Sequence, residues 1–247
     1  MFSALFLASV LIIDNHTEKI SSYAYQDRED ITEVRFEAPS HVKEIGEYAF
    51  LGCSNIKKIE LPASLEKIGE GAFRECSSLE ELIIPPRVKA LPKYMCAWDT
   101  ALHSVRLPAR LQDIGSHAFI YCSALPDIKI PATVTHIGSN AFSCCKELKT
   151  IELPANMKEL ESYAFSECVS LENAVLPANK NMLGELIFSG CRNLRSLTVM
   201  SSTPPVFDCN SFIFEPDETS LYSQCRLIVP ASSRRAYTLA PGWQLFD

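Results

Sequence analysis

The chain has little that would attract a nucleic acid or an anionic membrane. Its 247 residues include 23 basic and 30 acidic side chains, which gives a net charge of −7, and only 21% of the residues are charged. Nucleic-acid binding normally needs a broad basic surface, so we expect no nucleic-acid partner. The apolar fraction of 47% is ordinary for a globular chain of this length, which can enclose a substantial core.

Long hydrophobic runs are also missing. The apolar segment at the start, residues 1–13, is far shorter than the roughly 20 residues that span a bilayer. The same segment has no basic start and no small-x-small cleavage site, which a signal peptide would have. We therefore expect no membrane insertion, and these residues alone do not assign a compartment.

The patterns of common catalytic sites are absent from the sequence. It contains no glycine-rich phosphate loop and no H-E-x-x-H pair, and no Ser, Cys or carboxylate keeps a fixed offset from a base. The sequence thus predicts a protein that is not an enzyme and that holds no cofactor and no metal.

A strict repeat organises the residues that are present. The repeat is clearest in the prolines, which recur at intervals of 23 residues: Pro39, Pro62, Pro85, Pro108, Pro131, Pro154 and Pro177. Phe, Ala, Gly and Cys columns keep the same step. One unit has the form L-x-x-I-x-L-P-x-x-V-x-x-I-G-x-x-A-F-x-x-C-x-x.

The hydrophobic period changes inside each unit. Apolar and polar residues alternate in segments such as 59–61 and 128–130, which predicts a short strand that ends at the following proline. Downstream, Ile137, Ala141, Phe142 and Cys145 have a spacing that suits a short helix or 3₁₀ turn. Strands this short cannot bury an apolar side alone, so the units must stack. We predict an α/β repeat solenoid of about nine units, with one parallel sheet and short helical or 3₁₀ turns on the opposite side.

The repeat resembles the 23-residue leucine-rich repeat of the BspA-type family of bacterial surface proteins. Its signature I-P-x-x-V-x-x-I-G-x-x-A-F-x-x-C-x-x-L is nearly complete over residues 130–148, and the resemblance extends over about residues 11–247. It implies a leucine-rich repeat fold and a location at the cell surface or outside the cell. It also implies a binding surface, because members of the family mostly bind ligands, which differ between members.

The two ends depart from the repeat. We expect a single domain in which residues 1–13 form an N-terminal cap and first strand, residues 14–200 form regular repeats, and residues 201–247 form a divergent last repeat and a C-terminal cap. In that cap, residues 226–229 suit a last strand and residues 231–239 a helix that begins near Ser232 or Ser233. Trp243 and Phe246 are expected to close the core.

Cysteine is abundant but badly spaced for zinc or disulfides. Zinc sites need two close pairs, and among the 10 cysteines only Cys144 and Cys145 lie close together. Side chains in a parallel ladder point the same way, which opposes disulfide geometry. We therefore expect reduced cysteines that pack as small hydrophobes, six of them in one column: Cys53, Cys76, Cys122, Cys145, Cys168 and Cys191.

The outward strand positions are the first candidate binding surface. They carry both signs of charge and a few apolar side chains: Lys58, Glu60, Glu81, Ile83, Arg106, Asp127, Lys129 and Glu152. Binding of a protein ligand through this face is what the resemblance implies. The alternative is a solvated sheet whose opposite charges pair across strands at about 0.2–1 kcal/mol each. The histidines at 103, 117 and 136 fall in variable polar columns and are expected to be solvated.

The second candidate is an aromatic cluster at an irregular unit. Trp98 and Tyr121 share one column, and Tyr94, His117 and Ile120 lie on the same edge, where exposed aromatic residues are common interface anchors. In this unit Cys96 replaces the repeated Phe, Met95 replaces Ala, and an Asp at 99 takes the Cys position, so we expect a local distortion. The alternative is that Trp98 folds inward to fill the space beside Cys96.

These patterns predict a non-catalytic protein-binding or adhesion module. The resemblance implies a partner protein on a host or neighbouring cell. A structural or self-assembly module that stacks through its ends is the alternative, and carbohydrate binding is a third possibility. We expect a monomer or weak self-association.

Overall fold

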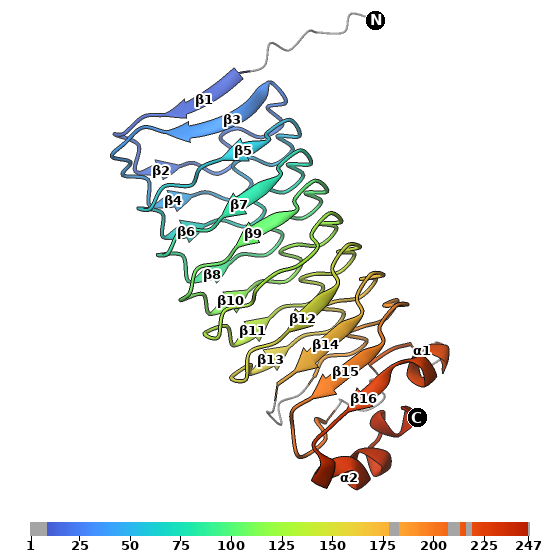
Figure 1. The fold of residues 1–247 in the computed structure, drawn as a ribbon. Coiled ribbons are helices and arrows are strands. Elements are labelled where there is room, and N and C mark those ends of the chain that lie inside the picture. Colours follow the sequence, from blue (N-terminus) through green and yellow to red (C-terminus); the bar gives the residue numbers. More distant parts are fainter. Residues whose placement is uncertain (1–8, 178–182, 207–212, 216–218, 247) are drawn as a thin grey trace, which may run out of the picture.

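The computed structural model describes residues 9–177, 183–206, 213–215 and 219–246. The chain winds into a parallel-stranded solenoid of about eight turns, close to the nine units expected. The coils stack along one axis, so that strand β1 and helix α2 lie at opposite ends of the stack (Figure 1). The predicted fold class is thereby confirmed.

A first row of strands runs along the whole stack. It consists of a five-stranded parallel sheet in the order β1, β3, β5, β7, β9 and a four-stranded one in the order β12, β14, β15, β16. The partners lie mostly one repeat apart, as in Glu81 opposite Ser104. The bounds are β1 Ser9–Ile13, β3 Ile31–Phe36, β5 Lys58–Ile59, β7 Glu81–Ile83, β9 Ser104–Arg106, β12 Thr150–Glu152, β14 Asn173–Leu176, β15 Ser196–Val199 and β16 Arg226–Ile228.

A second row of two-residue strands was not expected. It forms two further parallel sheets, in the orders β2, β4, β6 and β8, β10, β11, β13. The expected single sheet is therefore corrected to two rows, because the apolar residue after the repeated proline also pairs with the next coil. The bounds are β2 Lys19–Ile20, β4 Glu44–Ile45, β6 Lys67–Ile68, β8 Ala90–Leu91, β10 Asp113–Ile114, β11 His136–Ile137 and β13 Glu159–Leu160.

The third side of each coil is a run of turns, where a short helix or 3₁₀ turn was expected. Residues four apart in this run have positive φ, for example His117 and Tyr121, both at 61°. Alternate N–H groups donate to the next coil, as from Phe119 to the carbonyl of Ala141 at 2.8 Å and from Tyr121 to that of Ser143 at 2.9 Å. The backbone therefore bonds between coils instead of within a helix. We call this side the turn row.

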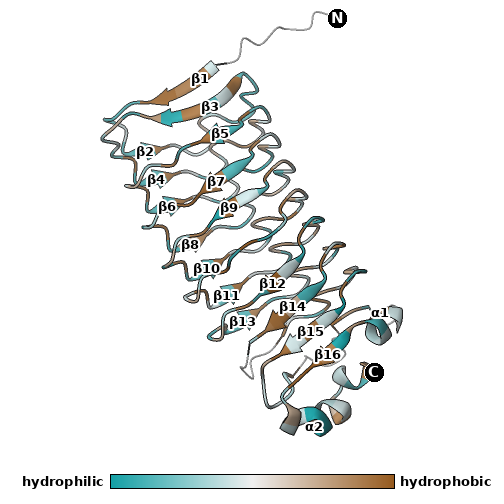
Figure 2. Ribbon diagram, in the orientation of Figure 1, coloured by the Kyte–Doolittle hydropathy of each residue, from teal (hydrophilic) through white to brown (hydrophobic). Residues whose placement is uncertain are grey.

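The interior holds the predicted columns. The phenylalanines are buried and stack between coils, with ring centroids 5.3 Å apart for Phe119 and Phe142 and 5.4 Å for Phe142 and Phe165. Nine of the ten cysteines lie in the described residues, and all nine are buried free thiols. In the column each thiol donates to a carbonyl of the preceding coil, as from Cys145 to Phe119 at 3.3 Å. Polar and apolar segments alternate along the coils (Figure 2).

Two prolines interrupt the rows at different places. The second row breaks between β6 and β8, and the first row between β9 and β12. Pro92 occupies a position at which other coils donate an N–H to the coil before, as Gly115 does to Leu91 at 2.9 Å. Pro126 likewise replaces a donor, equivalent to Lys149, whose N–H bonds the carbonyl of Pro126 at 3.1 Å. Proline has no N–H, so each break follows from the loss of a ladder donor.

The C-terminal end contains the described helices. They are α1 Thr219–Gln224, the 3₁₀ segment η1 Ala231–Ser233, α2 Arg234–Leu239 and the 3₁₀ segment η2 Trp243–Leu245. Trp243 is 1% and Phe246 8% exposed, and the Trp243 indole N–H donates to the carbonyl of Pro205 at 2.9 Å. The division into caps and repeats stays a prediction, since residues 1–8 of the expected N-terminal cap lie outside the described part. Among the described residues, no helix has the length and apolar character needed to cross a membrane.

Candidate functional site

The turn row presents the predicted aromatic residues as a surface ladder. Tyr94 and Trp98 occupy the two positive-φ positions of one coil, and His117 and Tyr121 occupy the same positions of the next. The ring centroids are 4.7 Å apart for Tyr94 and His117 and 5.6 Å apart for Trp98 and Tyr121, with interplanar angles of 19° and 12°. The structure thus brings these four predicted residues together in two stacked pairs.

Arg74 completes this surface, and sequence reasoning missed it. Its guanidinium carbon lies 4.8 Å from the ring centre of Trp98 and 5.8 Å from that of Tyr94, and Arg74 also pairs with Glu75 at 3.0 Å. The residue one repeat later is Ala97, whose small side chain leaves room for the arginine between the two rings. We call Arg74, Tyr94, Trp98, His117 and Tyr121 the aromatic patch.

The alternative in which Trp98 fills the core is wrong. Trp98 is half-buried on the surface, whereas Met95, Cys96 and Asp99 of the same coil are fully buried. Tyr121 keeps 38% of its surface exposed, and Ile120 beside it is half-buried. The patch therefore offers ring faces and edges that are held in place by stacking and a cation–π contact.

Two patch residues have pKa values shifted in the direction that favours their neutral forms. Burial, together with the nearby charge of Lys93, lowers the pKa of His117 below its ordinary value. A hydrogen bond with the thiol of Cys144 raises the pKa of Tyr121. Arg74 is then the positively charged member of an otherwise uncharged aromatic surface.

The strand face carries its eight predicted residues as expected from the pattern. Lys58, Glu60, Glu81, Ile83, Arg106, Asp127, Lys129 and Glu152 are all exposed, and Ile83 is 53% exposed. Lys58 and Glu60 form an ion pair at 2.5 Å. Asp127 and Lys129 lie in the gap of the first row, so they do not continue the ladder of Arg106. The eight side chains therefore do not form one continuous ladder.

A groove accompanies each proline break. The larger, of about 990 Å³, lies over the first row beside the Pro126 break and includes Lys129, Glu152, Val175 and Met200 in its lining. The other, of about 730 Å³, lies between β6 and β8 and is lined by Lys67, Arg87, Lys89 and Arg110 together with Glu66. Both could have been sought in the sequence, since Pro92 and Pro126 stand in columns that otherwise donate an N–H.

Two of the histidines expected to be solvated are half-buried. His117 belongs to the aromatic patch, and the ring of His136 lies between Asp113 and Glu161, with a nitrogen-to-oxygen distance of 2.9 Å to each. His103 is exposed as expected.

A stack of parallel coils with a fixed 23-residue repeat, a polar strand face and a ladder of exposed side chains defines a leucine-rich repeat solenoid. Its sequence matches the family described as "BspA type Leucine rich repeat region" in six copies, over residues 1–124 and 89–213. The chain belongs to this BspA-type leucine-rich repeat family, as its sequence predicted. The family suggests a protein-interaction or surface module, and leucine-rich repeat solenoids are generally not enzymes.

Solved structures of bacterial leucine-rich repeat proteins are similar to the chain. A leucine-rich cell surface protein from Faecalibacterium prausnitzii is 25% identical with a TM-score of 0.58, over 77% of this chain and 66% of that one. The leucine-rich repeat protein of T. pallidum is 27% identical with a TM-score of 0.54, over 76% and 78%. One from Bacteroides ovatus shares the fold at 23% identity and a TM-score of 0.63, over 93% and 65%. The chain thus spans slightly less than two thirds of the first and third of these proteins. No curated protein matches the sequence.

Proposed function

We propose that the chain is a non-catalytic binding module at a bacterial surface, which holds a protein of a host or neighbouring cell on the aromatic patch. The observation that carries the proposal is the stacked ladder of Tyr94, Trp98, His117 and Tyr121 with Arg74 between two of its rings. Interfaces are enriched in Trp, Tyr and Arg, and a few such residues supply most of the binding free energy.

Rigidity supports the same proposal. Each patch residue sits on a turn whose N–H groups bond the next coil, as from Trp98 to Ile120 at 2.8 Å. Stacking fixes the ring planes, so little side-chain entropy is lost when a partner binds. The strand face with its mixed charges would then contribute orientation more than affinity. The cell-surface protein of Faecalibacterium prausnitzii supports an extracellular location for this chain.

We expect the double substitution Trp98→Ala with Tyr121→Ala to weaken binding to target cells by at least about tenfold, as loss of two interface anchors would. The measurement is the binding curve of labelled protein on host or neighbouring bacterial cells, by flow cytometry. Tyr23→Ala is the matched control, because Tyr23 stacks on Tyr48 in the same turn row, at 5.4 Å, and is 53% exposed.

Thermal unfolding of each variant accompanies the binding curves. Equal binding by the double variant and the control, at equal stability, would refute the patch. Charge reversal at Glu81 and Arg106 then tests the strand face as the site. Protease treatment of the cells should abolish binding, whereas removal of glycans should not, which separates a protein ligand from the carbohydrate alternative.

Self-assembly through the solenoid ends is the competing role. The strand β16 ends the first row in the described part of the chain, and its Ile228 is 39% exposed. Sedimentation velocity at increasing protein concentration separates the two roles, because an end-stacking module should form dimers without any ligand. Under our proposal the protein sediments as a monomer or associates only weakly.

A further inference from the structure

The outward positions of the second row form a charged ladder with two parts. In the first, Glu44 lies between Lys19 and Lys67, and its Oε1 is 3.2 Å from each ammonium nitrogen. In the second, Asp113, His136 and Glu159 occupy consecutive rungs on β10, β11 and β13. Opposite charges alternate in the first part, whereas the second part places a histidine between two carboxylates.

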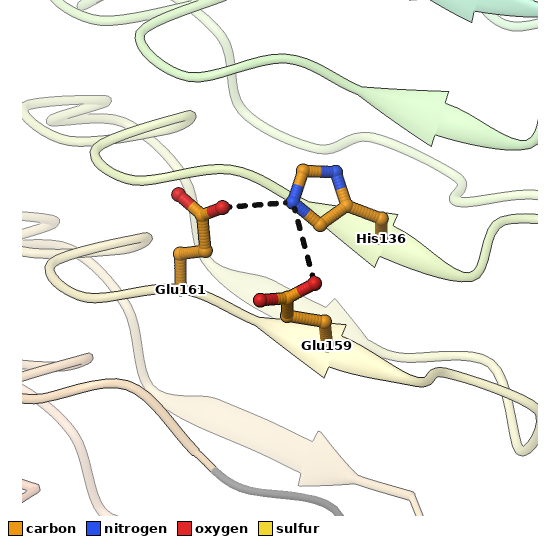
Figure 3. A group of neighbouring side chains, drawn as sticks. All are labelled: His136, Glu159 and Glu161. Atoms are coloured by element: carbon orange, nitrogen blue, oxygen red, sulfur yellow. Dashed lines mark hydrogen bonds and ion pairs between the residues drawn. The ribbon is translucent and has the colours of Figure 1, made fainter.

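A third carboxylate joins this second part. The Nε2 atom of His136 lies 2.9 Å from Glu161 Oε1 and 4.0 Å from Glu159 Oε2, and both side chains point toward the same ring nitrogen (Figure 3). One nitrogen and one oxygen from each glutamate lie within 4.8 Å of one another. His136 and Glu161 are half-buried and Glu159 is exposed, so the group is open to an ion from solution.

Glu161 holds a position that other coils give to glycine. Glycines at 46, 69, 115, 138 and 184 occupy this column, because an added Cβ would collide with the preceding coil, as at Gly138 against the backbone of Ser116. In the six coils that follow Gly46, only Pro92 and Glu161 depart from it. The carboxylate of Glu161 reaches both His136 and Ser139, and the N–H and hydroxyl of Ser139 donate to Glu161 Oε2 at 2.8 and 2.7 Å. Glu161 therefore places a carboxylate beside His136 from a position that most coils leave without a side chain.

Asp113 orients the imidazole from the other side. Its Oδ2 lies 2.9 Å from His136 Nδ1. A proton on Nδ1 donated to this carboxylate leaves the lone pair of Nε2 directed at the two glutamates. Histidine ligands of metals almost always donate their other N–H in this way.

The local charge favours a cation at Nε2. Three carboxylates surround one imidazole, and no lysine or arginine forms an ion pair with any of them among the described residues. Even a protonated imidazole would leave an excess of negative charge. The distances also suit an ion, since ligand atoms at about 2.0–2.1 Å in a tetrahedral site lie about 3.3 Å apart, between the two values observed for Nε2.

We propose that His136 Nε2, Glu159 and Glu161 bind a divalent transition metal of the zinc type, with Asp113 as the outer partner that orients the histidine. Water would supply the remaining ligand, because one imidazole and two carboxylates leave a tetrahedral position open. The ion would join the coils that carry β11 and β13, and it would bind independently of any partner at the aromatic patch.

Calorimetric titration of the folded protein with ZnCl₂ tests this site. We expect one zinc per chain and a rise in the unfolding temperature. His136→Gln should remove this binding event, and Asp113→Asn should weaken it about tenfold, as loss of an outer-shell partner typically does. His103→Gln, at an exposed histidine, is the matched control and should leave binding unchanged. If His136→Gln fails to fold, Glu159→Gln tests the same site, because this side chain is 63% exposed and its replacement should not disturb the core.

All these variants keep the ten cysteines, so zinc bound by thiols would not be lost in His136→Gln and retained in His103→Gln. Binding of Co²⁺ should give an absorption spectrum without the thiolate charge-transfer band. Unchanged zinc affinity in both His136→Gln and Glu159→Gln, or a thiolate band with Co²⁺, would overturn the proposal.

Discussion

Replacing Phe142 by Ala is expected to lower the free energy of unfolding by about 3–5 kcal/mol, the cost of truncating a buried phenylalanine. Phe142 has no exposed surface and stacks on Phe119 and on Phe165, with centroid distances of 5.3 and 5.4 Å and interplanar angles of 10° and 2°. Truncation leaves a cavity inside the stack and removes two ring contacts. Equilibrium unfolding in urea, followed by circular dichroism, measures the change.

Phe119→Ala is the matched comparison. Phe119 is equally buried but stacks on one phenylalanine only, because Cys96 takes the next position in the column. One aromatic contact fewer should make its loss milder by about 0.5–1.5 kcal/mol. Equal losses for the two variants would show that ring stacking adds nothing beyond burial.

Replacing Asp99 by Asn is expected to raise the free energy of unfolding by about 1–3 kcal/mol at pH 8, the cost of a buried polar group without a partner. Asp99 has no exposed surface. Its Oδ1 accepts the N–H of Cys76 at 2.8 Å, while the buried Oδ2 has no hydrogen-bond partner. An asparagine keeps the acceptor, removes the charge and offers an N–H to the carbonyl that the column cysteines use in other coils.

The gain should depend on pH in a defined direction. Burial raises the pKa of Asp99 well above its ordinary value, although hydrogen bonds from Cys96 and the N–H of Cys76 act in the opposite sense. The folded protein therefore keeps a proton that the unfolded chain releases above about pH 4, and stability is lost as the pH rises from there toward the folded-state pKa.

Asp99→Asn removes this pH dependence. The stability that the variant gains over the unsubstituted protein should therefore be small at pH 4.5 and largest at pH 8. Thermal unfolding of both proteins at the two pH values measures this gain. Asp127→Asn is the control, because Asp127 is an exposed carboxylate of the strand face. An identical gain at both pH values would contradict the assignment of the penalty to a buried carboxyl group.

The 23-residue period could be predicted because stacking forces equivalent residues into columns. Phe142, Cys145 and Trp243 are buried as their positions indicate. The second row could not be predicted, since two residues such as Lys67 and Ile68 are too few to show an alternation. The sequence of the turn row has a spacing close to that of a helix, because its positive-φ residues recur every four positions, as Tyr94 and Trp98 do.

The binding surfaces were only partly visible in the sequence. Trp98 and Tyr121 were found because they share a column, whereas Arg74 depends on a neighbour one coil away that is small enough to make room. Asp113, His136 and Glu159 also share a column and could have been found by the same rule. Glu161 comes from a different column, which most coils give to glycine, and its contact with His136 is seen only in the folded structure.

The staggered positions of Pro92 and Pro126 have a mechanical consequence. Where the second row is open, the strands β5 and β7 and the turn row remain bonded, and where the first row is open, β10, β11 and β13 remain bonded. We therefore expect each opening to act as a hinge between segments of the stack that are bonded in both rows. Under tension or torsion we expect the stack to flex at these two coils without separating, so that its curvature adapts to a partner while the chain stays in one piece.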